Sequence, residues 1–237
     1  MSAWKRTYIV VFISNLVTAI AMMSFLPFFP SFLEELGLEE REDVEWWSGL
    51  CFGAAPFAAA LMGPVWGSLS DRIGHKWMIV RAMFAVTLFV GAMAYVTSPM
   101  QLFVMRLCQG VFSGFIPPSI TLVSISAPQH RQGRVTGNLQ AALAAGSVFG
   151  PLLGAALGPA YGMRVVFLVV AGSAALSALL VMAFATEDPR LLESYERWSP
   201  GSVLRGVYRD FVRILRMPVL RRALLVLVVV QFGLGAT

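Results

Sequence analysis

The sequence predicts an all-α membrane protein, and its composition carries that prediction. Of the 237 residues, 57% are hydrophobic and only 13% are charged, whereas a soluble domain carries about 25% charged residues. The mean hydropathy is +0.73, so the chain holds more apolar surface than one soluble core could bury. We therefore expect lipid to surround most of the chain.

Six apolar runs reach the length of about 20 residues that a membrane helix needs. They are residues 8–33, 46–69, 77–97, 101–127, 138–158 and 165–185. A further run, 223–237, would extend only about 22 Å as a helix, short of the membrane core. We expect three parts: a six-helix bundle at 1–185, a cytoplasmic basic linker at 186–222, and the truncated start of a seventh helix at 223–237.

The basic residues predict the orientation of these helices. One side of the predicted membrane collects Lys5, Arg6, Arg72, Lys76, Arg81, Arg131, Arg134 and the linker arginines. Because basic residues favour the cytoplasmic side, we expect a cytoplasmic N-terminus in a plasma membrane, most simply a bacterial inner membrane. The same distribution accounts for the net charge of +5 without a nucleic-acid partner. Within the linker, apolar residues recur every fourth position between arginines, which favours an amphipathic helix on the inner leaflet over a soluble loop.

A weak internal repeat divides the six helices into two sets of three. GPVWG at 63–67 is echoed by GPLLG at 150–154, and proline pairs recur in the first and fourth runs. The second and fifth runs cross the predicted membrane in opposite directions, so the pattern indicates an inverted 3+3 repeat. This arrangement is common in secondary transporters.

Charge is concentrated in GSLSDRIGHKWMI, residues 67–79, between the second and third runs. Glycines suit a tight turn, and Asp71 can cap a helix start and accept bonds from arginine. The segment resembles a loop motif of the major facilitator superfamily, with His75 in place of an arginine and Ile79 in place of a leucine. The resemblance implies a conformational latch that biases one of two access states; the alternative is an ordinary positive-inside turn. The latch residues would be Gly67, Asp71, Arg72, Gly74 and Lys76.

The fourth run contains an arginine, in QLFVMRLCQGVFSG. Arg106 lies about 7 to 8 Å from the outer end of this run, where a charge is costly and indicates function. Gln109 shares its helix face. Together with Gly110 these residues resemble a second motif of the same family, whose arginine is linked to proton coupling. The alternative is an arginine that extends to the outer headgroups.

The fifth run places glycines at every fourth position: Gly146, Gly150, Gly154 and Gly158. This spacing makes a face on which a neighbouring helix can approach closely, and Pro151 is expected to bend the helix. The pattern resembles the family's antiporter motif, with Ala155 in place of its last glycine. The alternative is tight helix packing with no bearing on transport direction.

The first run ends in FLPFFP, where Pro27 and Pro30 resemble a motif of the twelve-helix drug:proton antiporters. Asn15 is a candidate cavity residue because an amide in mid-membrane needs a polar partner. Further candidates for the cavity are Met22, Met23, Phe25, Phe28 and Phe29.

The resemblance implies a secondary active transporter that exports hydrophobic or cationic small molecules by alternating access, coupled to protons, rather than an enzyme. Its partners would be the small-molecule substrate, protons, the lipid bilayer and a C-terminal six-helix bundle. No Asp or Glu lies inside the six runs, so we expect a proton-binding acid in that second bundle. His75 and His130 are expected in loops, no metal site or cofactor is indicated, and no phosphate-binding glycine loop suggests ATP. The alternatives are a facilitator or symporter for sugars or other metabolites, and a non-transporting membrane receptor or scaffold.

Overall fold

A computed structural model of the chain describes residues 2–187. The predictions for the linker beyond residue 187 and for the seventh helix at 223–237 lie outside these described residues. The described part is helical, as predicted. Its elements are α1 (Ala3–Phe25), η1 (Leu26–Phe28), α2 (Phe29–Glu35), α3 (Arg41–Ile73), α4 (His75–Met93), α5 (Pro99–Phe112), α6 (Ile116–Ser126), η2 (Gln129–Arg131), α7 (Gln132–Tyr161) and α8 (Met163–Phe184).

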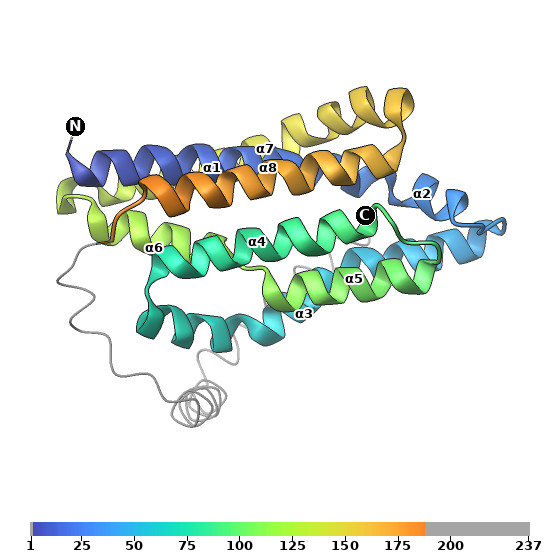
Figure 1. The fold of residues 1–237 in the computed structure, drawn as a ribbon, viewed down its shortest axis with the longest axis horizontal. Helices are drawn as coiled ribbons and strands as arrows, with labels where there is room; N and C mark the ends of the chain where they lie inside the picture. Colours follow the sequence, from blue (N-terminus) through green and yellow to red (C-terminus); the bar gives the residue numbers. More distant parts are fainter. Residues whose placement is uncertain (1, 188–237) are drawn as a thin grey trace. The chain divides into compact units, whose positions relative to one another are not determined.

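These helices form six spans that are long and apolar enough to cross a membrane. They are Ala3–Glu35, Arg41–Ile73, His75–Met93, Pro99–Ser126, Gln129–Tyr161 and Met163–Phe184. Each predicted run corresponds to one span, so the prediction of six membrane helices is confirmed. Successive spans run in opposite directions, which sets α1 and α7 side by side and parallel (Figure 1).

Proline interrupts the first span near its end. α1 ends at Phe25, Pro27 lies in the 3-10 turn η1, and Pro30 lies in the first turn of α2. Proline has no backbone N–H and cannot complete the α-helical bonding pattern. The first turn of a helix tolerates this loss because its amides have no intrahelical partner.

The fourth span is broken, and the expectation of one continuous helix at 101–127 is wrong. α5 ends at Phe112 and α6 begins at Ile116. Between them Gly114 has φ +118°, a conformation that side chains disfavour. Pro117 and Pro118 follow, and their missing amides cannot bond back across the break. Both the first and the fourth span are thus interrupted at a proline pair, as an inverted repeat would require.

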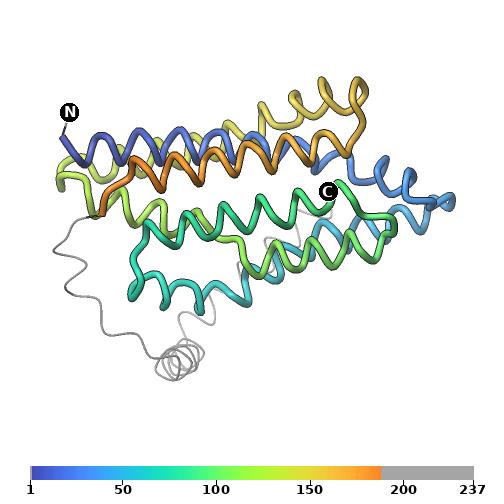
Figure 2. The backbone as a smooth tube through the Cα atoms, viewed as in Figure 1, coloured from blue at the N-terminus to red at the C-terminus, as the bar shows by residue number. Residues whose placement is uncertain are grey.

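The helices pack through two buried apolar clusters. The largest side chains of the first are phenylalanines, among them Phe25, Phe32 and Phe167, which are fully buried among α1, α2 and α8. The second joins the other end of α1 to α4, α6, α7 and α8 around Val11 and Leu139. The backbone trace shows α8 running along α1 (Figure 2), and α8 contributes residues to both clusters. Large apolar side chains such as Phe57, 65% exposed, face outward, as the surroundings of a membrane protein require.

Polar contacts fix the ends of the bundle. The Thr7 hydroxyl lies 3.1 Å from the carbonyl oxygen of Thr186 and accepts from its backbone amide at 3.0 Å. At the other end, the Arg164 guanidinium donates to the carbonyls of Ala94 at 2.8 Å and Val96 at 3.2 Å. These bonds tie the end of α8 to the start of α1, and the start of α8 to the end of α4.

Candidate functional site

The charged segment forms a one-residue turn between α3 and α4. Gly74 has φ +104° and donates its amide to the Ser70 carbonyl at 3.0 Å. Only glycine adopts this conformation without strain, so the expected need for glycine is met at Gly74. Arg72 lies half-buried in the last turn of α3. Lys76 lies in the first turn of α4, with its ammonium 5.8 Å from the Trp77 ring centre.

His75 is not the loop residue that we expected. It is the first residue of α4, and only 5% of it is exposed. Its Nδ1 atom lies 2.6 Å from the Ser70 hydroxyl oxygen. The side chain therefore joins α3 to α4 inside the bundle, whereas His130 lies exposed in η2.

Glu187, rather than Asp71, accepts hydrogen bonds from the backbone amides at the start of α4, which have no acceptor within the helix. One carboxylate oxygen accepts from the His75 amide at 2.9 Å, and the other accepts from the Lys76 amide at 3.3 Å. A carboxylate is favoured here because the start of a helix carries partial positive charge. The signal in the sequence was an acidic residue directly after the sixth apolar run. We overlooked it because we assigned that residue to the linker. Asp71 instead lies exposed in the last turn of α3.

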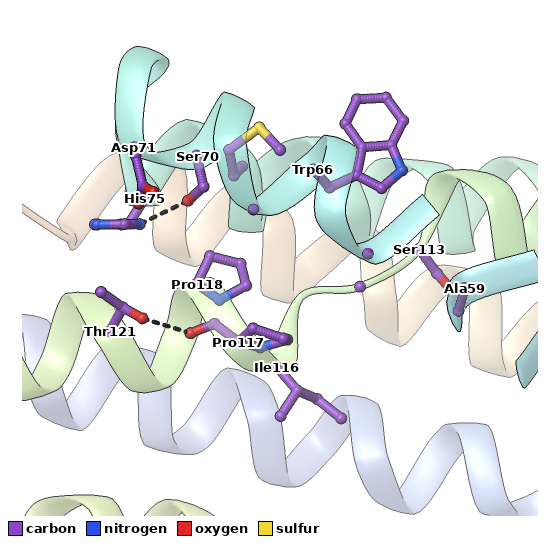
Figure 3. A pocket seen from close by; sticks show the side chains of 14 residues that line it. Ala59, Trp66, Ser70, Asp71, His75, Ser113, Ile116, Pro117, Pro118 and Thr121 are labelled. Carbon is purple, nitrogen blue, oxygen red and sulfur yellow. Dashed lines mark hydrogen bonds between the residues drawn. The ribbon is translucent and has the colours of Figure 1, made fainter. Parts of the chain in front are cut away.

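A cavity of about 310 Å³ lies between this turn and the break in the fourth span (Figure 3). Gly67 and Asp71 of α3 line one wall, with His75 at the start of α4. The opposite wall comes from the break, including Ser113 and Pro117. The structure thus brings two of the predicted latch residues next to a helix break that the sequence analysis did not predict.

Trp66 closes one side of this cavity and holds the break. Its indole N–H donates to the Val111 carbonyl at 2.6 Å. In a continuous helix that carbonyl would accept from the amide of Phe115, but the break removes this partner. The Arg81 guanidinium stacks on the Trp66 indole ring, with its central carbon 3.6 Å from the ring centre.

Arg81 was expected only to set orientation on the cytoplasmic side. The structure places it in the second turn of α4, and its guanidinium nitrogens are buried without a hydrogen-bond acceptor among the described residues. Stacking on an aromatic ring is the contact that arginine makes there. The position of Arg81 inside an apolar run, close to its start, was the signal that could have identified it as a buried residue.

Arg106 is buried, with 3% of the residue exposed, so the alternative of a side chain extending to the headgroups is wrong. Its Nε donates to the Cys51 carbonyl at 3.0 Å, and its Nη1 donates to Gln109 Oε1 at 2.6 Å. The guanidinium lies 5.7 Å and 5.3 Å from the ring centres of Phe25 and Phe29. A cation is thereby held between α3 and α5 on an aromatic surface.

The remaining residues of this motif complete the contact around Arg106. Gln109 donates through Nε2 to the Met22 sulfur at 3.5 Å, which links α5 to α1. A methyl group added at Gly110 would overlap the carbonyl oxygen of Ala55. Gly110 therefore allows the backbones of α3 and α5 to touch.

Asn15 finds a polar partner but does not line the cavity. It is fully buried, and its Oδ1 accepts from the Ser119 hydroxyl at 3.2 Å. Phe25 and Phe29 are likewise fully buried, so none of the three lines a cavity within the described residues, and their role in a cavity of the whole transporter stays a prediction. They join helices within the bundle instead.

The glycine face of α7 packs on α1. A methyl group added at Gly146 would lie 2.7 Å from the Ala19 Cβ, and one at Gly150 would lie 2.5 Å from the Met23 Cβ. At Gly154 it would overlap the Ser24 carbonyl oxygen. We name this contact of the three glycines with α1 the glycine seam. Gly158 lies beyond it and would meet only the Met163 sulfur, at 3.4 Å, while Pro151 lies within one continuous helix.

The sequence matches the model of the Major Facilitator Superfamily over residues 11–237. The chain belongs to the Major Facilitator Superfamily. The prediction of an all-α transporter bundle rather than an enzyme is therefore confirmed.

Named relatives of this family member include a multidrug efflux pump and a multidrug resistance protein. It is 34% identical over 185 residues to the multi-drug resistance efflux pump PmrA of Streptococcus pneumoniae, which covers 78% of this chain and 46% of that protein. It is 29% identical over 187 residues to the multidrug resistance protein MdtG of Proteus mirabilis, covering 79% of this chain and 46% of that protein. The chain thus spans about half the length of the curated relatives it matches.

A solved structure shows the same fold. The crystal structure of the human organic anion transporter MFSD10 superposes with a TM-score of 0.72 at 20% sequence identity. The match covers 86% of this chain and 53% of that one. The chain therefore shares the fold of about half of that transporter.

Proposed function

We propose that this chain supplies the N-terminal bundle of an exporter of hydrophobic or cationic small molecules, driven by protons and working by alternating access. The observation that carries the proposal is the 34% identity to the efflux pump PmrA over 185 residues. In this proposal residues 1–185 are the bundle, 186–222 the cytoplasmic linker and 223–237 the start of a seventh helix. The protein lies in a bacterial plasma membrane with its N-terminus in the cytoplasm.

Arg106 is the proposed coupling residue. Its burial with Gln109 keeps a fixed positive charge inside the membrane, where a charge has a strong effect on nearby ionisable groups. An acid in the second bundle would bind the transported proton. The charge of Arg106 would favour the ionised form of that acid and so its release of the proton.

The turn between α3 and α4 is the proposed latch. Asp71 is exposed beside the cavity, where it is free to bond to the second bundle in one access state. Gly67 leaves room on the same wall, and Gly74 with Arg72 and Lys76 fixes the turn that presents Asp71. Binding of substrate and protons would shift the balance between the two states.

The test uses inside-out membrane vesicles that contain the native polypeptide, with ethidium as the transported cation. We expect ethidium uptake when a proton gradient is formed, and its collapse on adding a protonophore. Arg106→Gln removes the positive charge that favours release of the proton from the acid, and one pKa unit of that effect corresponds to about tenfold, so we expect the initial rate to fall at least about tenfold. Arg41→Gln is the matched control, because Arg41 makes only an exposed pair with Glu45.

Two results would contradict the proposed export, and a third would contradict the role of Arg106. Sugar flux that ignores the proton gradient would indicate a facilitator. Ethidium binding without flux, in vesicles where the polypeptide is intact, would indicate a receptor or scaffold. Equal rates for Arg106→Gln and wild type would remove Arg106 from the coupling mechanism.

A further inference from the structure

A second pocket, of about 220 Å³, lies where α1 and α7 begin. α1 contributes Trp4, Lys5 and Tyr8, and α7 contributes Arg134 and Asn138. These residues lie in the first two turns of α1 and α7, at the start of two membrane spans, so we place the pocket at the boundary between membrane and water. It is separate from the cavity beside the latch, and no step of the proposed transport uses it.

Three cations line this pocket without a carboxylate. They are Lys5, Arg131 and Arg134, all exposed. The sequence has no Asp or Glu from Met1 to Leu33, and none from Arg72 to Thr186. Within residues 2–187 the cations have no ion-pair partner, since the one salt bridge found there joins Arg41 to Glu45. Among the residues that the structure describes, the one hydrogen-bond acceptor found for the Arg131 side chain is Nε2 of the neighbouring His130, at 3.3 Å.

The aromatic residues of the pocket hold donors in place. The Trp4 ring centre lies 5.9 Å from the Lys5 ammonium and 5.9 Å from the Arg131 guanidinium. The Tyr8 hydroxyl accepts from the Asn138 amide at 2.7 Å, which leaves its own hydrogen free to donate. The pocket therefore presents cations and one hydroxyl donor toward the same space.

An apolar edge accompanies these donors. Ile9 lines the pocket with 41% of its surface exposed, next to buried Val135. Tryptophan and tyrosine favour the headgroup level of a membrane, and basic pockets between membrane helices bind anionic headgroups. Free phosphate would use the cations but would gain nothing from an exposed isoleucine. A phospholipid uses both.

We propose that this pocket binds the headgroup phosphate of an anionic phospholipid in the leaflet where α1 and α7 begin. Lys5 and Arg134 contact the phosphate oxygens, the Tyr8 hydroxyl donates to one of them, and an acyl chain passes along Ile9. The lipid would bridge the two helices at the end opposite to Gly154 of the glycine seam. Its binding does not depend on what the protein transports.

The test is native mass spectrometry of the full-length polypeptide in detergent, titrated with phosphatidylglycerol or with phosphatidylcholine. We expect tighter binding of phosphatidylglycerol. Since a basic residue contributes about fivefold to binding of an anionic surface, Lys5→Gln with Arg134→Gln should weaken it by about 30-fold. Arg6→Gln is the matched control: Arg6 is the exposed neighbour of Lys5 but does not line the pocket.

Each outcome decides the proposal. Retained binding in Arg6→Gln with loss in the double variant supports a built site, and equal losses in both would show diffuse charge and overturn it. Equal binding of the two lipids would overturn it as well. Displacement of phosphatidylglycerol by millimolar inorganic phosphate would assign the site to free phosphate instead. Tyr8→Phe, which removes one hydroxyl from a folded protein, should weaken binding by about threefold; no change would exclude the Tyr8 contact.

Discussion

Two regions of this bundle are held together in opposite ways. In the glycine seam, α7 meets α1 through backbone and small side chains, and a methyl group at Gly154 would overlap the Ser24 carbonyl. Around the cavity the contacts are made by side chains: Trp66 of α3 bonds to Val111 at the break in the fourth span, and His75 of α4 bonds to Ser70 of α3. The first region has no free space, whereas the second encloses about 310 Å³.

The difference indicates which part can change shape. Close-packed helices have one favourable arrangement, because any shift loses many contacts at once. A helix break beside a cavity has fewer contacts to lose, and its hydrogen bonds can be remade elsewhere. In the proposed alternating access, we expect α1 and α7 to move as one body and the segment around Gly114 to adjust.

The largest expected effect comes from filling the glycine seam. Gly154→Ala adds a methyl group where the Ser24 backbone lies, and such overpacking costs about 1–3 kcal/mol. Better helix propensity returns at most about 1 kcal/mol. The melting temperature in detergent should therefore fall.

Gly137→Ala is the control for this change. Gly137 lies on the same helix, but an added methyl group there meets nothing within 4 Å. We expect its melting temperature to stay the same or rise. If both variants melted alike, the seam would not be the tight contact described.

The next effect tests the clamp on the helix break. Trp66→Phe keeps an aromatic ring but removes the N–H that bonds to the Val111 carbonyl. An unsatisfied buried carbonyl costs about 1–3 kcal/mol, partly offset here because the cavity can admit water. We expect a moderate fall in melting temperature and faster amide hydrogen exchange in residues 113–116.

Trp77→Phe is the comparison for Trp66→Phe, since Trp77 is 52% exposed. It should leave both melting temperature and hydrogen exchange unchanged. Unchanged exchange at 113–116 in Trp66→Phe itself would mean that the tryptophan does not hold the break.

The smallest effect concerns the bond between Glu187 and α4. Glu187→Gln keeps one oxygen acceptor for the His75 and Lys76 amides but removes the negative charge. A charge at a helix start contributes about 0.3–1 kcal/mol, so we expect a small fall in melting temperature that high salt reduces. Glu45→Gln, in the exposed pair with Arg41, should give no measurable change. Equal melting temperatures of the two variants would mean that Glu187 does not stabilise the start of α4.

The sequence predicted some parts of the candidate site because they depend on local chemistry. A glycine face at four-residue spacing and a buried arginine one turn from Gln109 follow from helical periodicity. The need for glycine at position 74 follows from the length of the turn. The break at Gly114 was missed because the apolar run hides it, although Pro117 and Pro118 were its signal.

What the sequence by itself determined is the number of membrane spans within the described residues, the limits of most of them to within about five residues, and which helix faces are small or charged. These depend on composition and on the 3.6-residue period, which are local properties. The tertiary structure decided the partners: α7 meets α1, Glu187 bonds to a helix more than 100 residues earlier, and Arg81 stacks on Trp66. Such choices depend on how distant segments fill space together, and no local pattern encodes them.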